Sequence, residues 1–162
     1  MSSGVIHSIN VSNGGVPKRP RASAYIGVNG CEGDRQGNLA VHGGPDRAVC
    51  IFSLDLIEDL RADGHPIEPG SIGENLTIEG LDWPALRAGL VIEIGPVRLE
   101  LTKPASPCRT IAASFLDGDS NRVSQTLYPG WSRWCCRVLS EGTIAIGDRA
   151  IVKPAAQADL FG

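Results

Sequence analysis

Short apolar runs, interrupted by glycine and proline, constrain this fold more than any other feature of the chain. Glycine and proline contribute 20 and 11 of the 162 residues. Residues 48–52 form one compact apolar run, and residues 90–94 and 97–102 form two more on either side of a Gly-Pro break. The last of these alternates apolar and charged side chains, which is typical of a strand with one buried face. Short strands with turn residues between them predict a mainly β fold, either a barrel or a sandwich.

The remaining apolar segments predict one further strand and two helices. Alternation over residues 5–11 places His7 on the apolar face of a strand, so we expect a core histidine there. A helix over residues 54–63 follows a candidate N-cap at Ser53 and stops at Gly64. A second helix is expected to begin near Ser106 and to end at Gly118.

The organisation of the chain is expected to be simple. We find no internal repeat, no long linker and no low-complexity tract. Residues 1–154 are therefore expected to form a single domain, and residues 155–162 a flexible tail.

Charge and cysteine content exclude several classes of protein. A net charge of −3 argues against nucleic-acid binding, and no apolar run approaches the roughly 18 residues of a membrane span. The basic cluster at residues 17–21 is interrupted by prolines, so a solvated loop is favoured and a local anion site is the alternative. Five cysteines, with no CxxC pair, argue against a disulfide framework or a structural zinc site. Because the N-terminus also lacks the layout of a secretory signal, we expect a cytoplasmic protein with reduced thiols.

Cys108 is the candidate reactive residue. Ser106 is a good N-cap and Pro107 suits the first helical position, so Cys108 is expected to be the second residue of the helix. Unpaired N–H groups at that position, together with the charge of Arg109, favour the thiolate. The alternative is a thiol packed under the turn with ordinary reactivity. Among the other cysteines, Cys50 and at least one of the adjacent pair that follows Trp134 are expected to lie in the core.

Two polar segments form a second constellation. Residues 42–44 read His-Gly-Gly before a buried strand, with Arg47 close behind, and such a loop suits a phosphate or a polar ring. A glycine turn beside a satisfied histidine is the commoner explanation. In the sequence GSIGEN, Asn75 can donate and accept hydrogen bonds as heterocycle recognition requires, and a turn-capping asparagine is the alternative.

The chain carries four motifs in a fixed order: GDRQGNLAVHGGPDRAV, GSIGENLTIEGL, KPASPCRTI and GWSRWCCRVLSEGTIAIGD. Their order resembles the MOSC domain, a module at the C-terminus of molybdenum-cofactor sulfurases that is found also in amidoxime-reducing enzymes and as bacterial stand-alone proteins. The likeness spans residues 4–152. It implies a MOSC-type β-barrel with a few short helices.

The resemblance also implies a pterin-based molybdenum cofactor whose metal is ligated by the thiolate of Cys108. The residues that match family motifs lining the cofactor pocket are His42, Gly43, Gly44, Arg47 and Asn75. The basic residues available for the pterin phosphate are Lys18, Arg35, Arg47 and Arg109. One position departs from the family, which often has arginine where this chain has Ala105.

The similar short bacterial proteins begin with a GGVPK-like stretch and are thought to reduce N-hydroxylated bases. The resemblance therefore implies an oxidoreductase that acts on N-hydroxylated compounds such as hydroxylaminopurines. No flavin, haem or iron–sulfur motif is visible, so electrons are expected from a redox partner protein, and a homodimer is left open. The alternative is a non-enzymatic carrier of persulfide sulfur or of molybdenum cofactor on Cys108. A third hypothesis is an interaction domain with an inert Cys108.

Overall fold

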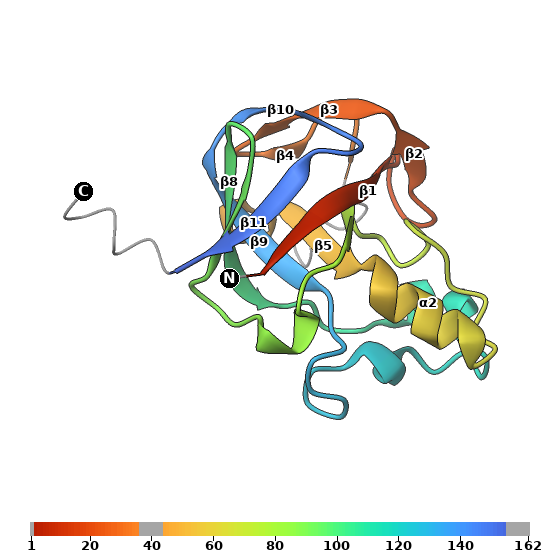
Figure 1. Ribbon diagram of the computed structural model, residues 1–162. Coiled ribbons are helices and arrows are strands. Elements are labelled where there is room, and N and C mark those ends of the chain that lie inside the picture. Colours follow the sequence, from red (N-terminus) through yellow and green to blue (C-terminus); the bar gives the residue numbers. More distant parts are fainter. Residues whose placement is uncertain (1, 36–43, 155–162) are drawn as a thin grey trace.

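A closed ring of seven strands forms the centre of the molecule. The computed structural model describes residues 2–35 and 44–154. The ring runs β1-β11-β7-β8-β9-β5-β6 and returns to β1 (Figure 1). Its strands are β1 (Ser3–Val11), β11 (Arg149–Lys153), β7 (Val91–Ile94), β8 (Val97–Pro104), β9 (Trp134–Ser140), β5 (Val49–Ser53) and β6 (Leu76–Glu79). The mainly β prediction is confirmed, and the predicted tail at residues 155–162 lies outside the described residues.

Smaller elements cover the two ends of the barrel. Strand β2 (Arg19–Arg21) pairs with β1, while β10 (Gly142–Ala145), β3 (Ser23–Gly27) and β4 (Gly30–Cys31) form a separate three-stranded sheet. That sheet lies across one end, at the top of Figure 1, and α2 (Leu54–Ala62) lies toward the other. The described chain also has four short 3₁₀ helices: Pro45–Arg47, Trp83–Ala85, Arg109–Ser114 and Ser120–Val123.

Alternating side chains fill the barrel interior. On β8, Val97, Leu99 and Leu101 are buried, whereas Arg98 and Glu100 between them are half-buried; on β7, Val91 and Ile92 are both completely buried. The two strands form an antiparallel hairpin with Ile92 opposite Leu99. The predicted strands at residues 90–94 and 97–102 are therefore confirmed, and in the second of them period-two alternation correctly identified the buried face.

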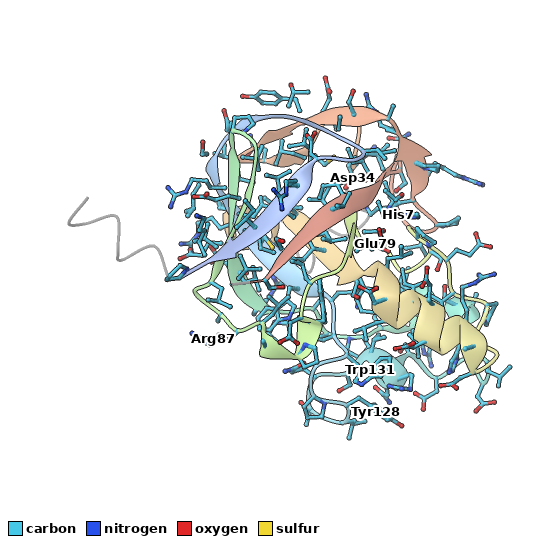
Figure 2. The ribbon with its side chains drawn as sticks, in the orientation of Figure 1. His7, Asp34, Glu79, Arg87, Tyr128 and Trp131 are labelled. Atoms are coloured by element: carbon cyan, nitrogen blue, oxygen red, sulfur yellow. The ribbon has the colours of Figure 1, made fainter. Side chains whose placement is uncertain are left out.

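Strand β1 departs from simple alternation. Its register with β6 shifts between Ile6 and Ser8, which is the mark of a β-bulge. The extra residue allows Ile6 and Ile9, three positions apart, to be completely buried, and it leaves His7 exposed (Figure 2). The expectation of a core histidine at position 7 was wrong, because a bulge reverses the faces that alternation assigns.

The two predicted helices had different outcomes. Helix α2 is confirmed, and the N–H of Leu56 donates to Ser53 Oγ at 3.2 Å as the N-cap predicts. The helix expected from Ser106 to Gly118 is instead a 3₁₀ helix over Arg109–Ser114. Cys108 is its N-cap residue, in extended conformation with φ −145° and ψ 170°. The Ser106 carbonyl accepts from Arg133 at 3.1 Å, so it already has a partner other than the N–H that an α-helix starting at Ser106 would offer it.

Candidate functional site

A buried arginine joins three segments that are far apart in the sequence. Arg133, directly before β9, is 6% exposed. Its Nη1 donates to the Ile72 carbonyl at 3.0 Å and its Nη2 donates to the Ser106 carbonyl at 3.1 Å. Its own carbonyl accepts from the Ala105 N–H at 2.9 Å. The loop before β6, the loop after β8 and the start of β9 therefore meet at one guanidinium.

Cys108 lies on the second of these loops, and its side chain is half-buried. Burial alone raises the pKa of the Cys108 thiol, but hydrogen bonds from the side chain and N–H of Thr110, the charge of Arg133 and the N–H of Ile111 together lower it below its ordinary value. A thiol of this kind is more often thiolate, which is the nucleophilic and metal-ligating form. The sequence predicted this direction, although the cause is a set of local donors and a buried cation in place of an α-helix dipole.

Beside this loop, four residues form a row across neighbouring strands. We call them the site row: Lys103, Cys135, Cys50 and Asn75. The register pairs Lys103 of β8 with Cys135 of β9, and Cys135 with Cys50 of β5. Asn75, just before β6, donates its N–H to the Cys50 carbonyl at 2.8 Å. Arg133 lies within electrostatic reach of Cys50, Cys135 and Cys108, since it lowers the pKa of each thiol against the larger effect of burial.

Asn75 is 1% exposed and its amide is fully engaged within the protein. Its Oδ1 accepts from the Cys50 N–H at 3.0 Å, and its Nδ2 donates to Asp34 Oδ2 at 2.9 Å and to the Asn10 carbonyl at 3.3 Å. The residue thus holds β5, β1 and the Asp34 loop together. This role is structural, but it differs from the turn-capping alternative for Asn75 because the side-chain partners are distant in the sequence.

Lys18 does not face a ligand site. Its ammonium is 8% exposed and binds both carboxylate oxygens of Asp34, at 2.6 and 2.8 Å. The N–H of Ser12 donates to the same carboxylate at 2.9 Å. The structure therefore does not support Lys18 as a phosphate partner, because its charge is already neutralised in a buried ion pair.

Arg35 is exposed and forms an isolated β-bridge with Asn13, and its N–H donates to the Ser12 carbonyl.

The described part of the His-Gly-Gly loop lies over β8 and β9. Gly44 is exposed, with φ +97°, and leads into the 3₁₀ helix that contains Arg47. The carbonyl of Asp46 accepts from Thr102 Oγ1 at 2.6 Å, which anchors this helix on β8. Arg47 is half-buried and contributes to lowering the pKa of Cys135. Arg109 is exposed directly after Cys108, and His42 and Gly43 lie outside the described residues.

Sequence reasoning missed two buried charged groups at this site. One is Arg133, whose signal was a charged residue between two tryptophans, directly before a buried strand. The other is Glu74, which is fully buried and has an Oε1 atom without a hydrogen-bond partner in the structure as described. Its Oε2 accepts from Thr77 Oγ1 at 3.0 Å. Burial raises the pKa of Glu74 to about 7, so this carboxyl carries a proton for part of the time at neutral pH.

The aromatic side chains near Arg133 serve packing. Trp134 is 5% exposed and belongs to the core. The guanidinium of Arg122 lies 4.2 Å from the ring centre of Trp131 and 4.3 Å from that of Tyr128, in a cation–π cluster at the lower edge of Figure 2. This arrangement agrees with the packing interpretation of Trp131 and Trp134.

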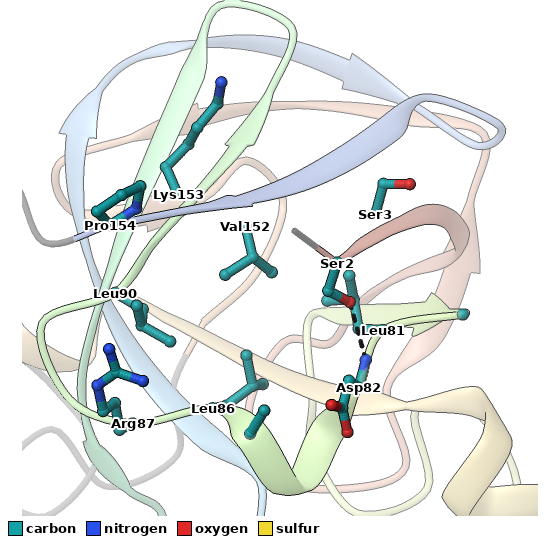
Figure 3. A pocket seen from close by; sticks show the side chains of 12 residues that line it. Ser2, Ser3, Leu81, Asp82, Leu86, Arg87, Leu90, Val152, Lys153 and Pro154 are labelled. Carbon is teal, nitrogen blue, oxygen red and sulfur yellow. Dashed lines mark hydrogen bonds between the residues drawn. The ribbon is translucent and has the colours of Figure 1, made fainter.

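A separate hollow of about 700 Å³ lies near the ends of β1, β7 and β11 (Figure 3). Its walls include Leu81, Leu86, Leu90 and Val152, with Arg87 at its edge. On one side of it, the Asp82 N–H donates to Ser2 Oγ at 2.9 Å (Figure 3). No residue of the site row and none of the predicted cofactor residues that the structure describes lines this hollow.

The fold and the site together define a class: a closed seven-strand barrel with a half-buried cysteine on the loop after β8. The family model of the MOSC domain matches residues 38–150, and the chain belongs to that family. The resemblance stated from the four motifs, and the barrel it implied, are thereby confirmed.

Known proteins similar to this chain support the same assignment. Uncharacterized protein YflK of Bacillus subtilis is 32% identical over 137 residues, which cover 82% of this chain and 60% of that protein. A protein named Reductase from Gibberella moniliformis is 31% identical over 130 residues, which cover 76% of this chain and 22% of that protein. The crystal structure of YiiM from Geobacillus stearothermophilus has the same fold, with a TM-score of 0.67 at 24% identity over 93% of this chain and 75% of that one. The chain thus spans about three fifths of YflK and about one fifth of the reductase.

None of the helices in the described ranges is long and apolar enough to cross a membrane.

Proposed function

We propose that this MOSC protein is a molybdenum-cofactor-dependent oxidoreductase that reduces N-hydroxylated compounds such as hydroxylaminopurines, with the Cys108 thiolate as the protein ligand of the metal. The observation that carries the proposal is the half-buried Cys108 thiol, whose pKa is lowered by local donors and by Arg133 against the effect of burial. A soft thiolate suits a molybdenum centre. The similarity to a protein named Reductase supports the same class of reaction.

The residues around Cys108 fit such a cofactor. Within residues 2–35 and 44–154, no three His, Cys, Asp or Glu side chains are grouped to hold a metal ion. A metal at Cys108 would therefore depend on the cofactor for ligands in addition to this thiolate. Arg47, Lys103 and Arg109 provide positive charge for the pterin phosphate. Arg133 places a cation beneath the loop in which Ala105 replaces the family's arginine.

When bound, the cofactor would supply the two-electron redox chemistry. Reduction of an N–OH group to N–H consumes electrons and protons in equal number and releases water. Glu74 is the group of this site best suited to hold a proton near neutral pH, because burial raises its pKa to about 7. The electrons would come from a redox partner protein, and the substrate would be a small molecule. We further propose a cytoplasmic protein that binds neither nucleic acid nor membrane, and a homodimer as its assembly to be tested.

Metal and pterin analysis tests the proposal directly. The protein and its Cys108→Ala variant are produced in a host that makes molybdenum cofactor, with Cys31→Ala as the control because Cys31 is buried in the separate sheet. We expect molybdenum and pterin with the wild type and with the control, and neither with Cys108→Ala. With an added electron-donating system, the wild type and the control should reduce hydroxylaminopurine, and Cys108→Ala should not. Equal metal content in wild type and Cys108→Ala would overturn the proposal.

The same thiol also supports a second candidate, a carrier of persulfide sulfur or of cofactor. The specific observation is that Cys108 combines thiolate character with partial exposure, as an acceptor of transferred sulfur needs. Incubation with a cysteine desulfurase, followed by intact mass measurement, separates the candidates. A Cys108-dependent gain of one sulfur atom, together with no molybdenum in the preparation above, would favour the carrier.

A further inference from the structure

Two cysteines of the site row face each other directly across antiparallel strands. Cys50 of β5 and Cys135 of β9 are register partners. Side chains of directly opposed residues point to the same face of a sheet, so both thiols lie on one side of it. Their neighbours Val49 and Cys136 form the next pair and are completely buried on the opposite face, in the barrel interior.

The hydrogen bonds of Cys50 establish which type of antiparallel pair this is. The Cys50 N–H donates to Asn75 Oδ1 at 3.0 Å, and the Cys50 carbonyl accepts from the Asn75 N–H at 2.8 Å. Because the N–H and carbonyl of a strand residue point to the same side, both groups of Cys50 face β6 and neither faces β9. Cys50 and Cys135 are therefore a non-hydrogen-bonded pair, for which the Cα atoms lie about 4.5 Å apart.

That separation falls within the range of about 4.4–6.8 Å that a disulfide spans. Both thiols are free in the structure. We propose that Cys50 and Cys135 form a reversible cross-strand disulfide, a modification site next to the Cys108 site, when a small-molecule disulfide such as oxidised glutathione is the oxidant. The proposal is independent of the proposed function, since it needs neither metal nor cofactor.

The surroundings indicate which thiol reacts first. Burial raises the pKa of both thiols, that of Cys50 to about 12, and at Cys135 the charges of Arg133, Arg47 and Lys103 act against this effect. The Cys135 thiolate attacks the small-molecule disulfide, forms a mixed disulfide and releases one thiol. The Cys50 thiolate then attacks the Cys135 sulfur and releases the second thiol. The protein dithiol loses two electrons and two protons, and the small-molecule disulfide gains them.

Thiol mapping at a series of redox ratios tests the proposal on the full chain. Reduced wild-type protein is equilibrated for hours in glutathione buffers of stepped composition, quenched in acid, unfolded, alkylated and digested. We expect a Cys50–Cys135 linked peptide pair, an intact mass lower by about 2 Da for the two hydrogens lost, and full reversal by dithiothreitol. Cys136→Ala is the matched control, because Cys136 is adjacent to Cys135 and faces the other side of the sheet, and it should retain the link. Cys50→Ser and Cys135→Ser should each abolish it.

Because the mapping is read on the wild type, poor folding of a variant does not prevent a decision. The proposal is overturned if both thiols are fully alkylated at the most oxidising ratio. It is also overturned if the link instead involves Cys136 or Cys108. A second readout is thermal: oxidation should raise the melting temperature of the wild type and leave that of Cys50→Ser unchanged.

Discussion

Arg133 connects the loop before β6 to the loop after β8 through a single buried guanidinium. Two backbone carbonyls, those of Ile72 and Ser106, stabilise a charge in this position through Nη1 and Nη2, whereas the buried Nε has no partner in the structure as described. The same charge lowers the pKa of Cys108 and the pKa of Glu74, in each case against the larger, opposite effect of burial. At the scale of single residues, the positions of the site loops and the protonation of the site depend on one side chain.

Replacing Arg133 by methionine should destabilise the protein by about 2–4 kcal/mol, because the buried Ile72 carbonyl and the part-buried Ser106 carbonyl both lose a charged partner. It should also raise the pKa of the Cys108 thiol, which the pH dependence of iodoacetamide alkylation measures on metal-free protein. Arg137→Met is the control, on the strand that follows Arg133: Arg137 is exposed and pairs with Asp46 and Glu100, so its loss should cost no more than about 1 kcal/mol. Equal destabilisation by the two substitutions would contradict this account.

Glu74 should make the stability of the protein depend on pH. Its folded pKa is about 7 against an ordinary 4.5, so between these values the folded chain binds the proton more strongly than the unfolded chain. The contribution of Glu74 to the free energy of unfolding should therefore be complete below about pH 4.5. It should fall as the pH rises to about 7, by up to about 3 kcal/mol. In Glu74→Gln this part of the pH dependence should vanish, as urea unfolding at stepped pH would show. A variant with the wild-type slope would exclude Glu74 as its source.

The helix α2 is the element that follows most directly from the sequence. Ser53, three buried apolar residues at helical spacing and the glycine stop are all local signals, and the structure uses each of them. Ser53→Ala should lower the free energy of unfolding by about 1–2 kcal/mol through loss of the N-cap. The upper end of this range applies if burial of the hydroxyl strengthens the cap bond. Thermal unfolding monitored by circular dichroism measures this, with Thr126→Ala as an exposed control. A change no larger than the control's would mean that the cap bond contributes little.

Other elements could not be predicted locally, for identifiable reasons. The bulge in β1 is set by pairing with β6, far along the chain, so the outward position of His7 could not be inferred from alternation. A 3₁₀ helix after Cys108 takes the place of the expected helix, and the Ser106 carbonyl has its partner in Arg133. The candidate thiol was predictable from its local sequence and from the family motifs. The cross-strand partner of Cys50 was not, since register is a property of two strands and not of one.

At the scale of the whole molecule, β1 is the strand that closes the ring. It pairs with β6 on one side and with β11 on the other. We call the place where β1 lies between β6 and β11 the closing seam. Gly4 lies in this seam, opposite Ala150, and a Cβ atom there would be 2.2 Å from the Glu79 carbonyl oxygen. The seam is thus narrow enough that only glycine fits without moving the backbone of β6 or β1.

Gly4→Ala should therefore weaken barrel closure and destabilise the protein by about 1–3 kcal/mol, the usual cost of overpacking. Because the ring is one hydrogen-bonded unit, the loss should appear as a lower midpoint of a single transition, with the same midpoint by tryptophan fluorescence and by far-ultraviolet circular dichroism. Ser3→Ala, at the exposed neighbouring position of β1, should leave the midpoint nearly unchanged. If fluorescence and circular dichroism instead separated in the variant, β1 would be detaching from a barrel that persists without it, and closure would not be cooperative with the rest of the fold.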